Sequence, residues 1–162
     1  MNPRSVIHDT FVIERTYAAM PTQVFAAFAS DEAKNSWGDT GDLAPVGESD
    51  GETVFDFRVG GRERFGFGWR DVVYRYDALY YDIVPDQRVV YSYEMYANDV
   101  RISVSIATIA FTKNSDGTAL IWTEQGAYLD GVDGPGAAGL RREGVSEMLD
   151  NLPRYLASHS AG

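Results

Sequence analysis

Residues 118–156 have the sequence TALIWTEQGAYLDGVDGPGAAGLRREGVSEMLDNLPRYL, which is the most informative part of the chain about its fold. Its first part, Thr118–Tyr128, is a strand-like run that leads into a short acidic loop rich in glycine. Its last part, Leu140–Leu156, repeats apolar residues at i, i+3, i+4, i+7 and i+10, which is one face of a helix. These residues are Val145, Met148, Leu149, Leu152 and Tyr155. Because the preceding chain is mostly strands, we expect a curved sheet around one long C-terminal helix, with a cavity between them.

The rest of the chain predicts further strands and two short helices after the first strand. Thr10–Tyr17 alternates apolar and polar residues as an opening strand does, and residues 1–9 are expected to form a loose N-terminal arm. Pro21 suits the first turn of one helix, and Ser30 can cap a second, which Trp37 ends. Strands are expected at 53–59, 62–70, 72–84, 88–96 and 101–112, with tight turns that favour antiparallel pairing. The prediction is one two-layer α+β domain over residues 1–162.

Composition excludes several classes of partner. The chain has 162 residues, enough for one domain with a core and an internal pocket. Its formal net charge is −10 and Lys and Arg do not cluster, which argues against nucleic acid. The chain has no Cys, which excludes disulfides and thiolate metal sites. It has no apolar run of membrane-spanning length and no signal-peptide core, so we expect a cytoplasmic protein without membrane insertion.

Familiar catalytic arrangements are absent from the sequence, and no cofactor or metal site is predicted. The only histidines, His8 and His159, lie near the two ends, where the pattern predicts no element that would hold them firmly. A Ser-His-Asp triad and a His-based metal site are therefore not expected. The acidic loop with Asp130 and Asp133 lacks the ligand number and spacing of a calcium loop, so we interpret it as a solvated loop.

Aromatic content is the unusual feature of the composition, at 13 % of the residues. One explanation is a sheet that favours aromatic side chains, and another is an aromatic-lined pocket. A curved sheet around a cavity would satisfy both. The candidate pocket residues are Trp37, Phe57, Phe67, Trp69, Tyr76, Tyr93 and Trp122. Tyrosine hydroxyls would matter most, since they place hydrogen-bonding groups on apolar walls.

Glu124 is the candidate polar group of this pocket. It shares its strand face with Leu120 and Trp122, so its carboxylate is expected beneath the closing helix. A carboxylate on an apolar face needs a partner or a raised pKa, and it could then orient a ligand or act as a general acid or base. The alternative is a structural bond at the rim of the sheet. Arg15 and Arg101 are the best candidate cations to partner it, and the alternative for both is a solvated residue at the end of a strand.

The terminal helix contributes two further candidates, Gly144 and Met148, which lie one turn apart on its predicted inner face. A glycine inside a helix costs roughly 1 kcal/mol relative to alanine. Either the close approach of a strand or room for a ligand would explain its presence. Pro153, late in the same helix, is expected to kink it or to end its regular hydrogen bonding.

Four parts of the chain carry a resemblance to a known family. They are FVIERTYAAMPTQVFAAFASDEAKNSW, FDFRVGGRE, YYDIVPDQRVVYSYEM and TEQGAYLDG with the later REG. Together they resemble the SRPBCC superfamily, also called START-like or Bet v 1-like, and its bacterial branch named after the heat-shock protein 90 ATPase activator. The resemblance covers about residues 10–157. It implies a helix-grip fold, with an antiparallel sheet wrapped around the C-terminal helix and a cavity for lipids, polyketides, hormones or other small apolar molecules.

Function within such a family depends on the cavity residues, so the fold does not decide it. The leading hypothesis is a small hydrophobic-ligand binding protein with an internal cavity between sheet and helix. A cyclase- or hydrolase-type enzyme that uses polar cavity residues is one alternative, and a chaperone-associated interaction module is another. The eukaryotic chaperone activator has a further domain that this chain lacks, which argues against chaperone activation. The expected partner is a small apolar molecule, and homodimers are common among such relatives.

Overall fold

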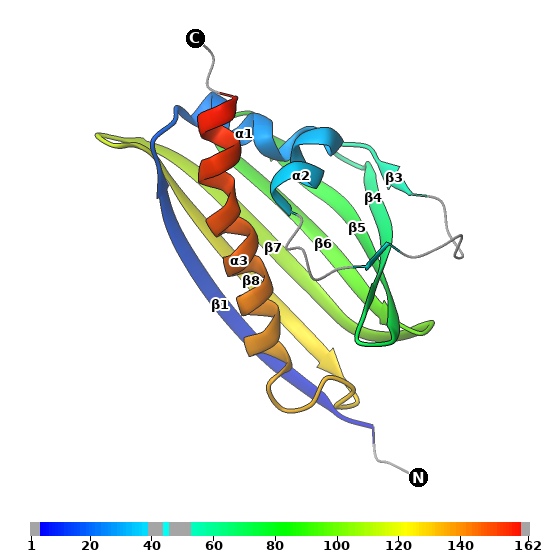
Figure 1. The fold of residues 1–162 in the computed structure, drawn as a ribbon. Coiled ribbons are helices and arrows are strands. Elements are labelled where there is room, and N and C mark those ends of the chain that lie inside the picture. The colour runs from blue at the N-terminus through cyan, green and yellow to red at the C-terminus, as the bar shows by residue number, and fades with distance from the viewer. Residues whose placement is uncertain (1–3, 39–43, 46–52, 160–162) are drawn as a thin grey trace.

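Residues 4–38, 44–45 and 53–159 are described by the computed structural model, and they form one antiparallel sheet and three helices (Figure 1). The first half of the chain contains β1 (Val6–Tyr17), α1 (Pro21–Phe28), α2 (Asp31–Gly38), β2 (Ala44–Pro45), β3 (Val54–Phe55) and β4 (Arg62–Trp69). The second half contains β5 (Val72–Val84), β6 (Arg88–Ala97), β7 (Val100–Asn114), β8 (Gly117–Leu129) and α3 (Ala137–Ser158).

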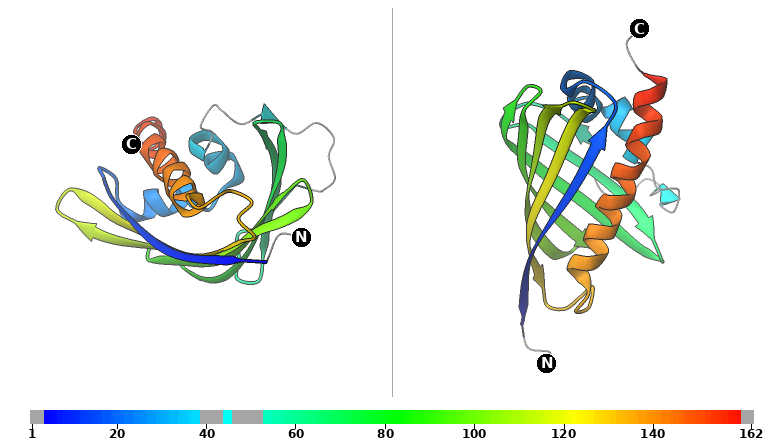
Figure 2. Two further views of the ribbon diagram at one scale, coloured as in Figure 1. Left: turned by 90° about the horizontal axis from the view of Figure 1, so that it is seen from below. Right: turned by 90° about the vertical axis from the view of Figure 1, so that its left-hand side faces the viewer.

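The sheet has the strand order β1-β8-β7-β6-β5-β4-β2, and β3 pairs with β4 outside this path. Strands β4 to β8 are neighbours in sequence and in space, whereas β1 crosses to the far edge to pair with β8. The sheet is curved, and all three helices lie on its concave side (Figure 2). We call this side the inner face and the opposite side the outer face. The arrangement confirms the predicted α+β helix-grip fold.

Strand β1 begins earlier than predicted. Val6 already pairs with Leu129 of β8, so the predicted loose arm is wrong from Val6 onward, and His8 lies in a strand. Residues 1–3 lie outside the described part. The side chain of Asp130 holds this end, because it accepts hydrogen bonds from the Ser5 backbone at 3.0 Å and from Arg4 at 2.8 Å. Alternation could not reveal the early start, because residues 6–10 are exposed on both faces of the strand.

Local signals set the starts of α1 and α2 as predicted. Pro21 occupies the first turn of α1, where its missing N–H costs no hydrogen bond. The Gln23 side chain accepts a hydrogen bond from the Met20 backbone at 3.0 Å and closes that end. In α2 the Ser30 hydroxyl accepts from the backbone N–H of Ala33 at 3.2 Å, which satisfies one free donor of the first turn.

Helix α3 packs its apolar stripe on the inner face, with Leu149 and Leu152 at 0 % exposure. It continues past Pro153 to Ser158, so the proline does not end the helix. A proline cannot donate to the carbonyl four residues earlier, which here is Leu149. The Tyr17 hydroxyl of β1 donates to that carbonyl at 2.8 Å and takes the place of the missing N–H. No helix of the described residues is apolar enough over a sufficient length to cross a membrane.

The predicted strand at 53–59 is much shorter, because β3 is only Val54–Phe55. Beyond it the chain turns back on itself, and the backbone N–H of Asp56 donates to the Arg62 carbonyl at 2.8 Å. A side chain at Gly61 would overlap the Asp56 carbonyl, so this close approach requires glycine. The alternation of aromatic residues in 53–59 therefore marks a turn that packs on the core.

Candidate functional site

Glu124 lies in a buried polar cluster on the inner face of the sheet. It is 1 % exposed, which confirms the predicted inward side chain and excludes the alternative at the rim. The Tyr93 hydroxyl donates to its Oε2 at 2.6 Å, and the Trp122 indole Nε1 donates to its Oε1 at 3.3 Å. Both carboxylate oxygens therefore have a donor from a neighbouring aromatic side chain.

Arg141 brings the positive charge to this cluster from the first turns of α3. Its Nη1 donates to the Tyr93 hydroxyl at 2.8 Å, and its Nη2 donates to the Ser103 hydroxyl at 3.2 Å. Tyr93 thus stands between Arg141 and Glu124, accepting from one and donating to the other. We call Tyr93, Ser103, Trp122, Glu124 and Arg141 the inner polar cluster.

Sequence reasoning missed Arg141 and named two other arginines as partners of Glu124. A signal was present, because Arg141 precedes Val145 by four residues and therefore lies on the same helix face. Arg15 instead bonds Asp150 of α3 at 3.0 Å, so the prediction that it partners Glu124 is wrong. The prediction for Arg101 is also wrong, because its Nε pairs with Glu94 at 3.1 Å.

Burial shapes the electrostatics of the inner polar cluster. Burial raises the pKa of Glu124 above its usual value, while the hydrogen bond from Tyr93, the charge of Arg141 and the bond from Trp122 oppose this rise. Burial also raises the pKa of Tyr76 and Tyr91 well above the usual tyrosine value. These hydroxyls therefore keep their protons near neutral pH, and they remain potential hydrogen-bond donors.

Ser105 adds a polar group without a partner beside this cluster. It is 1 % exposed and lies opposite Tyr93 in the β6–β7 register. Within the described part of the chain its hydroxyl makes no hydrogen bond. On β8, the ring of Tyr128 folds over Gly126, since a Cβ added there would lie 2.9 Å from the Tyr128 hydroxyl. Gly126 is the β8 partner of Ser105, so these groups share one area of the inner face.

An aromatic surface leads from the cluster to the β4 edge of the sheet. It consists of half-buried side chains from two strands, Phe65, Phe67 and Trp69 of β4 and Tyr74 and Tyr76 of β5. Cross-strand pairs stack, with ring centroids 4.8 Å apart for Phe65 and Tyr76 and 5.2 Å apart for Phe67 and Tyr74. Tyr76 also stacks on Tyr93 at 5.0 Å, which joins this surface to the inner polar cluster. We call the five side chains the aromatic wall.

Some predicted pocket residues lie in the core. Trp37 is 2 % exposed, and its indole donates to the Ala27 carbonyl at 2.9 Å between α1 and α2. Trp122 is 4 % exposed and meets the Tyr91 ring edge-on, with centroids 6.3 Å apart. Phe57 is half-buried and packs on Tyr80 at 5.1 Å. Trp37 therefore joins the two helices together.

Gly144 is exposed on an open flank of α3, so the prediction that it lies on the inner face of the helix is wrong. A Cβ added there would have no atom within 4 Å, so the close approach of a strand does not explain this glycine. Met148 and Asn151 follow at i+4 and i+7 on the same flank. Asn151 donates to the Trp37 carbonyl at 3.2 Å, so this flank faces α2. Met148 is half-buried and packs against the core.

A second buried carboxylate, Glu63, joins α2 to the sheet. Lys34 of α2 donates to its two oxygens at 2.7 and 2.9 Å, and the Tyr80 hydroxyl donates to it at 2.7 Å. The carboxylate is therefore neutralised by a close cation and bonded from two sides. This arrangement accounts for Glu63 as a structural group.

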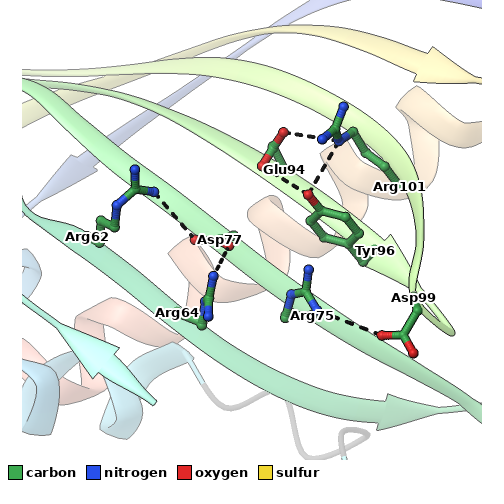
Figure 3. Close-up of polar contacts among 8 residues, drawn as sticks. All are labelled: Arg62, Arg64, Arg75, Asp77, Glu94, Tyr96, Asp99 and Arg101. Carbon is green, nitrogen blue, oxygen red and sulfur yellow. Dashed lines mark hydrogen bonds and ion pairs between the residues drawn. The ribbon is translucent and has the colours of Figure 1, made fainter. Parts of the chain in front are cut away.

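The outer face carries a separate network of charged side chains (Figure 3). Asp77 is held between Arg64 at 2.8 Å and Arg62 at 4.0 Å. The Arg101–Glu94 pair lies beside it, together with the Tyr96 ring (Figure 3). This network is on the side of the sheet away from the helices, opposite the inner polar cluster (Figure 3).

Comparisons with known proteins place the chain in a family. The family model described as Activator of Hsp90 ATPase homolog 1-like protein matches residues 18–157. A solved structure from Rhizobium leguminosarum is 40 % identical with a TM-score of 0.83, covering 97 % of this chain and 99 % of that one. One from Rhizobium loti is 44 % identical with a TM-score of 0.80, covering 94 % and 99 %.

A protein from Silicibacter pomeroyi named AHSA1 is 17 % identical with a TM-score of 0.70, covering 92 % of this chain and 98 % of its own, and this likeness shows the fold alone. No curated protein matches the chain. The family model spans the elements from α1 to α3, including the three strands and the helix that build the inner polar cluster. The chain therefore belongs to the family of Activator of Hsp90 ATPase homolog 1-like proteins, within the SRPBCC superfamily.

Proposed function

We propose that this protein binds a small apolar molecule between the inner face of its sheet and α3. The observation that carries the proposal is the aromatic wall, five half-buried side chains that end at a buried polar cluster. Ligand sites in proteins combine a mostly apolar lining with a few polar groups that orient the ligand. The wall would take the apolar body of the ligand, and the inner polar cluster would orient its polar part.

The open flank of α3 supports the same proposal. Gly144 is exposed and has free space around the position of a Cβ, on the flank that faces α2. In this proposal, the free space beside Gly144 would leave a ligand room to enter beside the helix.

The test is binding of N-phenyl-1-naphthylamine, a neutral apolar fluorophore, followed by its fluorescence. We expect a dissociation constant in the micromolar range, and Gly144→Leu should weaken binding severalfold because its side chain occupies the open flank. Gly139→Leu is the matched control, since Gly139 is also an exposed α3 glycine with free space, five residues away on a different side of the helix. No binding, or equal binding by both variants, would contradict the proposal.

An enzyme of cyclase or hydrolase type is the second candidate, and a specific observation favours it. Glu124, Tyr93 and Arg141 form a continuous chain of hydrogen bonds in a buried place. Such a chain can hold a proton on a defined atom beside a bound molecule. Glu124→Gln would then abolish turnover of a substrate while the protein still bound the neutral fluorophore, whereas loss of both together would favour a role in binding or folding alone.

A further inference from the structure

We infer that the ligand is an apolar acid, whose carboxylate is bound by Arg141 and Ser105 where the aromatic wall meets the inner polar cluster. This inference rests on the proposed function, since it names the chemical class of the ligand for the same site. It goes further in assigning the charge of the ligand, the two side chains that recognise it and the direction in which it lies.

The first step concerns the unused donors of Arg141. A guanidinium group has five N–H donors. Within the described part of the chain, the hydrogen bonds of Arg141 go to two neutral hydroxyls, those of Tyr93 and Ser103. Among the same residues it forms no direct ion pair with a carboxylate, because Tyr93 separates it from Glu124. A half-buried guanidinium without a carboxylate in contact is a ready site for an anion.

The second step concerns Ser105, whose hydroxyl is 1 % exposed and makes no hydrogen bond among the described residues. Buried polar groups without a partner are rare in folded proteins, because the loss of water is not compensated. Ser105 follows Ser103 by two residues on the same strand face and lies opposite Tyr93, so it is next to both groups that Arg141 bonds. An oxygen atom of a ligand at this point would satisfy both Ser105 and Arg141.

The third step is the sign of the charge. Both oxygens of Glu124 already accept a hydrogen bond, and the unused N–H groups of Arg141 can only donate. The Arg141 guanidinium also lies over the rings of Tyr93 and Tyr128, at 5.4 and 5.6 Å from their centroids, which holds it on the inner face. A carboxylate offers acceptors only, and it matches the forked donors of an arginine.

The direction of the ligand follows from the aromatic wall. Tyr76 stacks on Tyr93 at 5.0 Å and on Phe65 at 4.8 Å, so a continuous apolar surface starts beside the proposed carboxylate position. In a molecule with a flat ring system attached directly to a carboxylate, the rings would therefore contact the aromatic wall while the carboxylate binds Arg141. The inference excludes cationic ligands, which Arg141 would repel.

The test compares 2-naphthoate with 2-naphthalenemethanol, two molecules with the same rings that differ in charge. Each would compete with bound N-phenyl-1-naphthylamine, and its inhibition constant would be measured. In the wild-type protein we expect 2-naphthoate to compete at about tenfold lower concentration, as a hydrogen-bonded ion pair provides. Arg141→Gln should remove this preference while 2-naphthalenemethanol competes within about twofold of the wild-type value. Arg142→Gln is the matched control, because Arg142 is the exposed neighbour on the same helix.

Ser105→Ala provides a second test that does not depend on Arg141→Gln folding. It should weaken 2-naphthoate severalfold without lowering the thermal midpoint of the free protein, because the hydroxyl has no bond to lose in the unliganded state. Equal competition by the acid and the alcohol in the wild-type protein would overturn the inference and leave the proposed function standing. A preference that survives in Arg141→Gln would overturn it as well. If the neutral fluorophore does not bind at all, the proposed function fails first, and the inference fails with it.

Discussion

Glu124 illustrates at the residue scale how the sheet keeps a carboxyl group out of water. Its face of β8 is otherwise apolar, with Leu120 at 0 % and Trp122 at 4 % exposure. Hydrogen bonds from Tyr93 and Trp122 compensate part of the cost of burial, and so does the charge of Arg141, which bonds Tyr93 and does not contact Glu124 directly. Taken together, these effects favour the protonated form of Glu124 more than for a glutamate in water, since burial raises the pKa of Glu124. Folding is therefore coupled to protonation at this position.

Glu124→Gln should change the dependence of stability on pH. A carboxyl with a raised pKa in the folded state supports folding most at low pH, and this support is lost as the pH rises from the ordinary glutamate value of about 4.5 through the folded pKa. Glutamine cannot ionise, so the variant should gain stability relative to the wild type over this pH range, and the gain should level off above the folded pKa. Urea unfolding of both proteins at several pH values would measure this gain.

The control for Glu124→Gln is Glu143→Gln, which removes a carboxylate from the exposed side of α3. Its effect on the free energy of unfolding should stay within about 0.5 kcal/mol. A difference between wild type and Glu124→Gln that stays constant over the pH range would show that burial does not perturb this carboxyl.

At the element scale, α3 depends on β1 for more than apolar contact. Pro153 leaves the Leu149 carbonyl without its helical hydrogen-bond donor. Because Leu149 is 0 % exposed, water cannot donate a hydrogen bond to this carbonyl. The Tyr17 hydroxyl reaches it from the last residue of β1 at 2.8 Å. Arg15, also on β1, donates a hydrogen bond to the hydroxyl of Ser146 on α3 at 2.7 Å. A strand side chain thus completes the hydrogen bonding of a helix that contains a proline.

Tyr17→Phe should destabilise the protein by about 1–2 kcal/mol, because it leaves a buried carbonyl without a partner. In the background of Pro153→Ala the same change should cost clearly less, since the new N–H of residue 153 can bond the Leu149 carbonyl. Urea unfolding of the wild type, the two single variants and the double variant measures the difference. An equal cost of Tyr17→Phe in both backgrounds would show that the tyrosine and the proline are not coupled.

Helices and strands with one buried face were predictable from the sequence, whereas segments without a single buried face were not. β5 has the predicted bounds, Val72–Val84, because its aromatic residues alternate and Pro85 follows. The start of β1 was missed because its first residues are exposed on both sides. β3 was overestimated because a turn that packs aromatic side chains on the core imitates strand alternation. Periodicity in the sequence shows which residues are buried. It indicates a helix or strand only where that helix or strand itself produces the pattern of burial.

The candidate site was predictable in part for the same reason. Strand alternation places Glu124 on the inner face, and the structure confirms it. The partner of Glu124 depends on the angle at which α3 crosses the sheet, and no local sequence pattern determines this angle. Arg141 and Ser105 therefore emerge only from the packed structure, although each lies on a face that periodicity assigns. The cavity residues as a set stay a prediction.

At the scale of the whole molecule, pairing is uneven across the sheet. β1, β7 and β8 are 12, 15 and 13 residues long and pair along their lengths, and α3 covers them. At the other edge, the outer neighbours of β4 among the described residues are only β2 and β3, of 2 residues each. Long paired strands open only with global unfolding, whereas such an edge opens locally at lower cost. The aromatic wall starts at this weaker edge, so the proposed ligand would bind where the molecule opens most easily.

Amide hydrogen exchange followed by mass spectrometry should reveal this asymmetry. At times too short for β7 and β8 to exchange, peptides from β4 should already exchange, since their outer hydrogen bonds are few. Addition of N-phenyl-1-naphthylamine should slow exchange in β4 and in the first turns of α3, because a molecule between them must leave before they open. Strand β1 is the internal control, as it is an edge strand of 12 residues far from the aromatic wall. Protection that rises equally in β1, or β4 amides as slow as those of β7 without the fluorophore, would contradict a binding site built on the weaker edge.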